Sequence, residues 1–106
     1  MPRASFILPV HDAATTLDEA LASLIGQTFD DFEVLVFDDG SEDDSLAILE
    51  RAASREPRIG LVGSERLGLV GALQRLVDAS DAPLLARMDA DDVCHRLRLQ
   101  EQVALK

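Results

Sequence analysis

The sequence has little cysteine and little positive charge. Cys94 is its one cysteine, and ten Lys and Arg residues face twenty Asp and Glu residues, for a formal net charge of −10. A single cysteine cannot form an internal disulfide, so we expect a reduced, cytoplasmic setting. The acidic balance argues against binding bare nucleic acid, which needs basic residues, and against docking on an anionic membrane by charge alone. An acidic protein that binds phosphates needs a cation as a bridge.

Long apolar runs and glycine-rich phosphate loops are also missing. No apolar run approaches the length of a membrane span, and the N-terminus lacks the pattern of a signal peptide. Neither GxGxxG nor GxxxxGK[ST] occurs, which excludes the phosphate-binding modes that rest on such loops. The 106 residues, 47% of them hydrophobic, suffice for one small domain with a core, over residues 1–106.

Short apolar runs alternate with helical patterns. The predicted strands cover 5–10, 32–39, 58–63 and 82–88, and the predicted helices cover 16–28, 68–80, 95–106 and a segment that begins at Ser41 with acids in its first turn. Thr16 and Glu19 have the spacing of a capping box, and Gly26 suits a helix end. This alternation predicts a Rossmann-like α/β sandwich of three layers, with a parallel sheet between helices.

Polar side chains gather where three of the predicted strands end. These residues are His11 and Asp12 after the first strand, Asp38 and Asp39 after the second, and Asp89, Asp91 and Asp92 after the fourth. The carboxyl ends of parallel strands share one edge of the sheet, and ligands of such folds bind beyond it. The sequence therefore predicts a functional site at this edge.

The acids at 89–92 admit two interpretations. A single acid before a helix is most often a solvated cap, but three carboxylates exceed what one helix end needs. Carboxylate oxygens are the ligands that Mg²⁺ and Mn²⁺ prefer, often together with substrate phosphates. The spacing of DDGSEDDS excludes an EF-hand, and Cys94 with His95 is better explained as a buried thiol and its neighbour than as a zinc site.

The segment FILPVHDAATTLDEALASLIGQTFDDFEVLVFDDGSEDDSLAIL resembles the opening of family 2 glycosyltransferases, the inverting GT-A type, and ARMDADD resembles their DxD region. The resemblance covers almost the whole chain. It implies the strand order 3-2-1-4, an NDP-sugar donor that we expect to be a UDP-sugar, and a divalent cation, Mg²⁺ or Mn²⁺. The transfer would go to an acceptor hydroxyl, on a saccharide or a lipid-linked molecule, with inversion.

By the same resemblance, Pro9 and Val10 line the nucleotide cleft, and Asp39 accepts a hydrogen bond from the base. His11 would pack beside the base, although a solvated loop histidine is an equal alternative, and Asp38 would support the turn. His11 and Asp12 stand where the family often has an aromatic residue and Asn.

The metal site implied by the resemblance lies in the acid cluster. Asp91 would be the principal metal ligand, with Asp92 as the competing assignment, and Asp89 would lie near the ribose or the metal. The region ERLGLVGALQRLV matches the family loosely, so a role for Arg66 or Arg75 in phosphate binding stays open.

The family's acceptor-binding half, which supplies the catalytic base, has no counterpart in this sequence. We therefore expect a nucleotide-binding half that is inactive on its own, cytoplasmic, and in a longer protein peripheral to the inner face of the membrane. An edge strand protected only by Pro83 and Arg87 predicts a homodimer through residues 82–106. One alternative is an inactive α/β interaction module. A receiver-like signalling domain fits poorly, because the only lysine is Lys106.

Overall fold

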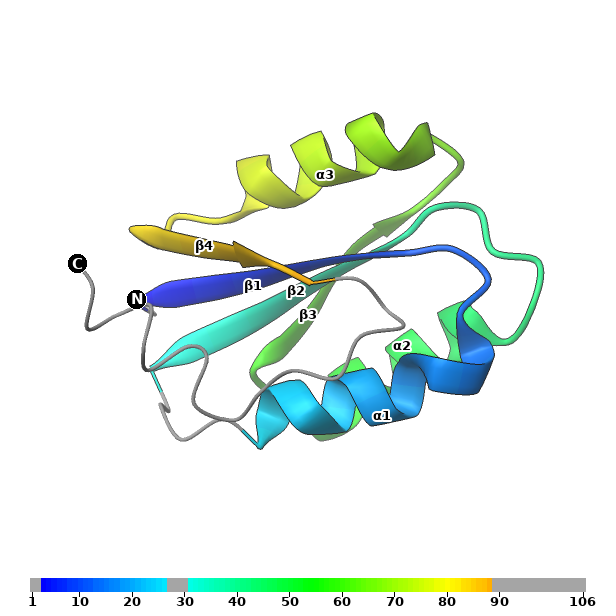
Figure 1. Ribbon diagram of the computed structural model, residues 1–106, viewed down its shortest axis with the longest axis horizontal. Helices are drawn as coiled ribbons and strands as arrows, with labels where there is room; N and C mark the ends of the chain where they lie inside the picture. Colours follow the sequence, from blue (N-terminus) through cyan, green and yellow to red (C-terminus); the bar gives the residue numbers. More distant parts are fainter. Residues whose placement is uncertain (1–2, 27–30, 89–106) are drawn as a thin grey trace.

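The computed structural model describes residues 3–26 and 31–88. Four parallel strands form one sheet in the order β3-β2-β1-β4, which confirms the order that the family resemblance implied (Figure 1). The strands are β1 (Ala4–Val10), β2 (Phe32–Asp38), β3 (Ile59–Ser64) and β4 (Leu84–Arg87), and the helices are α1 (Ala14–Ile25), α2 (Ser45–Arg55) and α3 (Gly68–Ala79). The acid cluster at 89–92 and the helix predicted over 95–106 lie outside the described residues.

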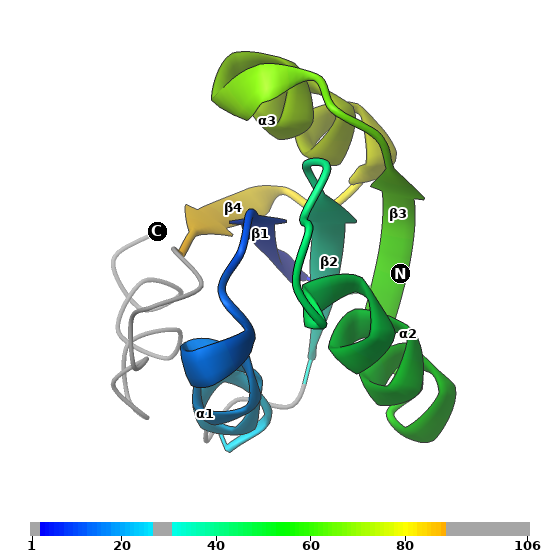
Figure 2. The same cartoon turned by 90° about the vertical axis from the view of Figure 1, so that its right-hand side faces the viewer.

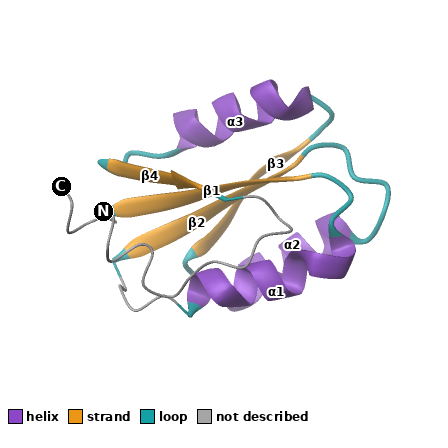
Figure 3. Cartoon of the chain, viewed as in Figure 1, coloured by secondary structure: helices purple, strands orange, loops and turns teal. Residues whose placement is uncertain are grey.

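Helices cover both faces of the sheet, α1 and α2 on one side and α3 on the other (Figures 1 and 3). Successive strand residues point to opposite faces. Phe6, Leu8 and Val36 therefore pack in the core that includes residues of α1 and α2, whereas Ile7 and Phe37 pack against residues of α3. Because both faces of the sheet are buried, the sequences of its central strands, β1 and β2, are nearly continuous apolar runs.

The capping box predicted at Thr16 and Glu19 is wrong. Helix α1 begins at Ala14, so its N-cap residue is Ala13, which makes no side-chain cap hydrogen bond, and the Thr16 hydroxyl donates to the carbonyl of Ala13. Oxygens of Asp43, in the β2–α2 connection, and of Ser45, the first residue of α2, take the place of that cap. The backbone N–H groups of Ala13 and Ala14 donate to Ser45 Oγ and Asp43 Oδ2.

The other helix ends follow the sequence more closely. Gly26 is the C-cap residue of α1, as predicted. Helix α2 begins at Ser45 rather than at Ser41, so the acids at 42–44 lie in the connection before it. Among the described residues, no helix is long and apolar enough to cross a bilayer.

Candidate functional site

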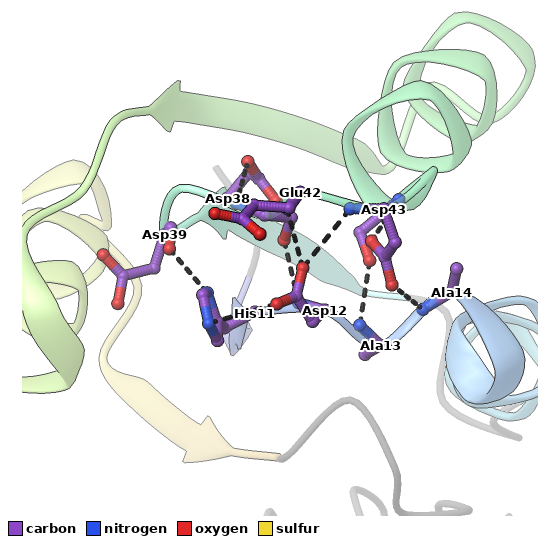
Figure 4. Close-up of polar contacts among 10 residues, drawn as sticks. His11, Asp12, Ala13, Ala14, Asp38, Asp39, Glu42 and Asp43 are labelled. Carbon is purple, nitrogen blue, oxygen red and sulfur yellow. Dashed lines mark hydrogen bonds and ion pairs between the residues drawn. The ribbon is translucent and has the colours of Figure 1, made fainter.

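The carboxyl ends of β1 and β2 continue into two loops that bind each other (Figure 4). The loop after β1 contains residues 11–13, and the loop after β2 contains residues 39–44. Asp39 donates its backbone N–H to the carbonyl of Val10 at 2.8 Å, which starts the contact where the strands end. The predicted site residues after the first two strands thus belong to one hydrogen-bonded unit.

Asp12 is the centre of this unit. Its Oδ1 accepts hydrogen bonds from the backbone N–H groups of Glu42 at 2.7 Å and Asp43 at 3.3 Å, and its own N–H donates to Ser41 Oγ at 2.9 Å. Asp12 has a φ of +48°, a left-handed conformation that Asp and Asn adopt more readily than most residues. A short acidic side chain at this position therefore suits both the backbone and the contact between the loops.

Asp43 makes the reverse contact, from the second loop to the first. Its Oδ2 accepts from the N–H of Ala14 at 3.1 Å, and its Oδ1 accepts from the N–H of Ser45 at 2.9 Å. Hydrogen bonds from Ser45, by its side chain first and then its backbone, hold the pKa of the Asp43 carboxyl below its usual value. The charged form of Asp43 is thus the one that joins the loops.

His11 connects the same loops on the side toward Asp39. Its Nδ1 lies 2.8 Å from the carbonyl oxygen of Asp39, and since a carbonyl can only accept, Nδ1 is the donor. Its Nε2 lies 3.4 Å from Oδ2 of Asp12. The His11 side chain is 43% exposed, so one part of the ring is available to a ligand at this edge.

The neighbouring carboxylates of Asp38 and Asp39 have different partners. Asp38 is buried, and its Oδ2 accepts from the N–H of Ser41 at 3.2 Å and from the hydroxyl of Ser64 at 3.3 Å, which confirms its predicted support of the turn. Asp39 Oδ1 accepts from the N–H groups of Leu67 at 2.7 Å and Gly68 at 2.9 Å. Asp39 thereby caps the start of α3, a role that the sequence pattern did not reveal.

Pro9 and Val10 reach the edge in different ways. Pro9 is partly buried near the end of β1, whereas the side chain of Val10 is buried in the core beneath α1 and α2. Val10 therefore contributes its backbone to this edge, through the hydrogen bond to Asp39.

The sequence left open whether Arg66 or Arg75 binds phosphate, and the two side chains have different surroundings. Arg75 forms an ion pair with Glu65 at 2.9 Å, and its guanidinium lies 5.7 Å from the centre of the Phe37 ring. The side chain of Arg66 instead lies over Gly40, where a Cβ would come within 2.8 Å of its Cδ. Gly40 has a φ of +68°, so both the backbone and this close approach favour glycine.

The predicted metal ligands are not among the residues that the structure describes. Asp89, Asp91 and Asp92 follow β4 in the sequence but lie outside the described ranges. Within 3–26 and 31–88, no group of three or more His, Cys, Asp and Glu side chains could hold a metal ion. The chemistry of the three carboxylates fits a hard divalent cation.

A family model described as "Glycosyl transferase family 2" matches residues 5–105 of the chain. The chain belongs to this family. An uncharacterized glycosyltransferase of Haemophilus influenzae is 33% identical over 93 residues, which are 87% of this chain and 29% of the relative. The putative glycosyltransferase EpsE of Bacillus subtilis is 30% identical over 105 residues, 97% of this chain and 38% of EpsE. The chain therefore spans about a third of the length of these relatives.

Solved structures of glycosyltransferases share the fold. The mannosyltransferase PcManGT from Pyrobaculum calidifontis, in complex with GDP-Man and Mn²⁺, has a TM-score of 0.86 and 28% identity, over 96% of this chain and 31% of that one. S. aureus TarS 1–349 in complex with UDP-GlcNAc has a TM-score of 0.78 and 27% identity, over 98% of this chain and 30% of that one. These likenesses extend over nearly all of the chain, so the sheet described above is the GT-A sheet.

Proposed function

We propose that this chain is the nucleotide-sugar-binding portion of an inverting, metal-dependent glycosyltransferase whose donor is an NDP-sugar, with a UDP-sugar as the first candidate. One observation carries the proposal: in a member of glycosyl transferase family 2, the loops after β1 and β2 bind each other and present His11 and Asp39 at the carboxyl edge. The complexes of PcManGT with GDP-Man and of TarS with UDP-GlcNAc support a sugar nucleotide as the ligand.

The proposed contacts with the nucleotide base follow from which atoms of Asp39 and His11 already have hydrogen-bond partners. Asp39 Oδ1 is occupied by the start of α3, which leaves Oδ2 as the acceptor for a base N–H. His11 is held by its Nδ1, so its ring can pack beside the base, and the partly buried Pro9, near the end of β1, would line the same cleft. The hydrogen bonds between the loops fix these groups before the ligand arrives, which lowers the entropy cost of binding.

Asp91, with Asp92 as the alternative, would hold Mg²⁺ or Mn²⁺, and Asp89 would lie near the ribose or the ion. The cation would neutralise charge that develops on the leaving diphosphate. The acceptor hydroxyl would attack the anomeric carbon in a single displacement, after a carboxylate outside this chain removes its proton. The 106-residue chain, about a third of the length of its relatives, would therefore bind the donor without transferring its sugar.

The remaining partners are part of the same proposal. The acceptor would be a saccharide or a lipid-linked molecule, and the protein would act in the cytoplasm or at the inner face of the membrane. The proposed homodimer contact covers residues 82–106, of which 89–106 lie outside the described residues. Light scattering of a concentrated sample tests this contact, and a monomer there would contradict it.

Calorimetric titration of the chain with UDP and UDP-GlcNAc tests the proposed function. With Mg²⁺ or Mn²⁺ present, we expect weak but saturable binding, and with excess EDTA we expect that binding to be lost. Equal affinity in EDTA would contradict the metal bridge. Absence of binding under every condition would favour the alternative, an inactive interaction module that keeps the fold.

A further inference from the structure

A hollow with a volume of about 270 Å³ lies between helices α1 and α2, which sit side by side on one face of the sheet (Figure 2). Four residues of each helix line it, at the spacing i, i+3, i+4 and i+7, starting from Asp18 in α1 and from Ile48 in α2. This spacing places the four residues on one face of each helix. The hollow continues to Ile59, the first residue of β3, and so reaches the amino end of that strand.

Two alanines keep this hollow open. Ala22 of α1 and Ala52 of α2 hold the i+4 positions of the two lining faces, where a longer side chain would fill the space. The floor is formed by aliphatic side chains, including Leu21 and Ile48, which belong to the core beneath the helices. The volume equals that of about nine water molecules in the liquid, at roughly 30 Å³ each, so the hollow can take one short alkyl chain but not two.

Two arginines stand along the α2 side of the hollow. Arg51 and Arg55 are one helical turn apart and both are exposed, and neither side chain has a hydrogen bond or an ion pair among the described residues. The aliphatic stem of an arginine can lie along an apolar surface while its guanidinium stays in water. Two guanidinium groups in this position can donate hydrogen bonds to one phosphate or carboxylate at the rim of an apolar floor.

The acids that line the hollow do not cancel this positive charge. Glu56 is paired with Arg58, whose Nε lies 3.0 Å from Oε1 of Glu56, so its charge is compensated. Asp18, on the α1 side, is the other acid of the lining. Two arginines without an ionic partner thus stand against one acid, and both are on the α2 side. A negatively charged group is therefore favoured beside α2, although the whole chain carries a formal net charge of −10.

We propose that the hollow between α1 and α2 binds a single-chain amphiphile with an anionic head group, a carboxylate or a phosphate ester. The alkyl chain covers the aliphatic floor, and the head group accepts hydrogen bonds from Arg51 and Arg55. Burial of the apolar chain supplies most of the affinity, and two exposed charge pairs add roughly tenfold together. The donor-binding residues proposed above follow the carboxyl ends of the strands, so this inference does not rest on the proposed function.

Titration of the 106-residue chain with decyl phosphate, followed by the chemical shifts of its backbone amides, tests the inference. The amphiphile is kept below the concentration at which it forms micelles. We expect saturable shifts that are confined to α1, α2 and the start of β3. Decanol and decyltrimethylammonium are the neutral and cationic analogues with the same alkyl chain, and we expect each to bind about tenfold more weakly than decyl phosphate or worse.

The double variant Arg51→Met, Arg55→Met keeps two unbranched stems but removes both guanidinium groups. Its affinity for decyl phosphate should fall about tenfold, to that of decanol. The double variant Arg3→Met, Arg66→Met is the matched control, because it removes two exposed arginines that do not line the hollow, and it should bind as wild type does. Ala22→Leu fills the hollow from an exposed position of α1 and should weaken binding of all three amphiphiles. Thermal melting of each variant shows that the fold is kept.

Three results would overturn the inference: equal affinities for the three amphiphiles, chemical shifts that move mainly outside the hollow, or an unchanged affinity in Arg51→Met, Arg55→Met. Vesicles of phosphatidylglycerol distinguish a free amphiphile from a membrane. Binding to these vesicles without any binding of monomeric decyl phosphate would assign the two arginines to a membrane surface, and it would overturn the inference as well.

Discussion

Asp39 accepts a hydrogen bond from the backbone N–H of Leu67 at 2.7 Å, across 28 residues of sequence. The same oxygen accepts from Gly68 at 2.9 Å, so the acid that follows β2 caps the helix that follows β3. A carboxylate at a helix N-terminus satisfies free N–H groups and is favoured by the helix dipole. Asp39, the candidate base-binding residue, therefore also caps the N-terminus of α3.

These two roles of Asp39 can be separated by substitution. Asp39→Asn keeps an oxygen for the N–H groups of Leu67 and Gly68, so we expect stability close to wild type. It replaces the free acceptor Oδ2 with an NH₂ donor, so UDP affinity should fall about tenfold or more. Asp39→Ala loses the cap as well and should cost about 1 kcal/mol in unfolding free energy. Urea denaturation and calorimetry measure both effects, and equal stability of the Ala and Asn variants would contradict the cap.

The contact between the loops predicts a similar contrast at Asp12. Asp12→Ala loses the acceptor for Glu42 and Asp43 and places alanine at a φ of +48°, so we expect a loss of about 1–2 kcal/mol. Asp12→Asn keeps the oxygen and tolerates the left-handed conformation, so it should stay within about 0.5 kcal/mol of wild type. Chemical denaturation of the two variants measures this difference.

The lowered pKa of Asp43 predicts that the free energy of unfolding depends on pH. Because the folded state lowers its pKa, the carboxylate contributes stability above the usual value of 3.8, and this contribution is lost as pH falls through the folded value. The free energy of unfolding of wild type should exceed that of Asp43→Asn near pH 6, and the gap should close in acid. Urea denaturation of both proteins between pH 3 and pH 7 gives the comparison. A gap that is constant over this range would contradict the shift.

Gly40 and Gly68 form a natural pair for testing the turn. Both have a positive φ, +68° and +82°, but a Cβ at Gly40 meets Arg66 whereas a Cβ at Gly68 meets nothing within 4 Å. Gly68→Ala should cost about 1 kcal/mol for its backbone alone. Gly40→Ala should cost more, because its Cβ must also displace the side chain of Arg66. Equal losses in the two variants would mean that Arg66 adapts without cost.

The acid cluster that follows β4 in the sequence predicts that UDP binding depends on a divalent metal ion. Asp91→Asn should abolish the Mn²⁺ dependence of UDP binding while the protein stays folded, because it removes a charged hard ligand. Asp81→Asn, at an exposed position before β4, is the control for a lost charge and should bind UDP as wild type does. Calorimetry with added Mn²⁺ distinguishes them. Loss of the effect in Asp92→Asn but not in Asp91→Asn would move the ligand by one residue.

The sequence by itself determined the alternation of strands and helices and the edge that carries the polar residues. Apolar runs of strand length and helical spacing are local patterns, and the parallel arrangement follows from them. The turn at Asp38 was also predictable, because its partner Ser41 is only three residues away. The order 3-2-1-4, now seen in the sheet, came from the family resemblance and not from these patterns.

Only the tertiary structure decided which groups the acids bind. The predicted capping box failed because Asp43 and Ser45, about 30 residues away, supply the oxygens at the start of α1. Asp39 caps α3, and Arg66 rather than Arg75 lies at the turn, for the same kind of reason. A short polar side chain bonds whichever partner the folded loops bring within about 3 Å, and sequence spacing carries no record of contacts made between loops.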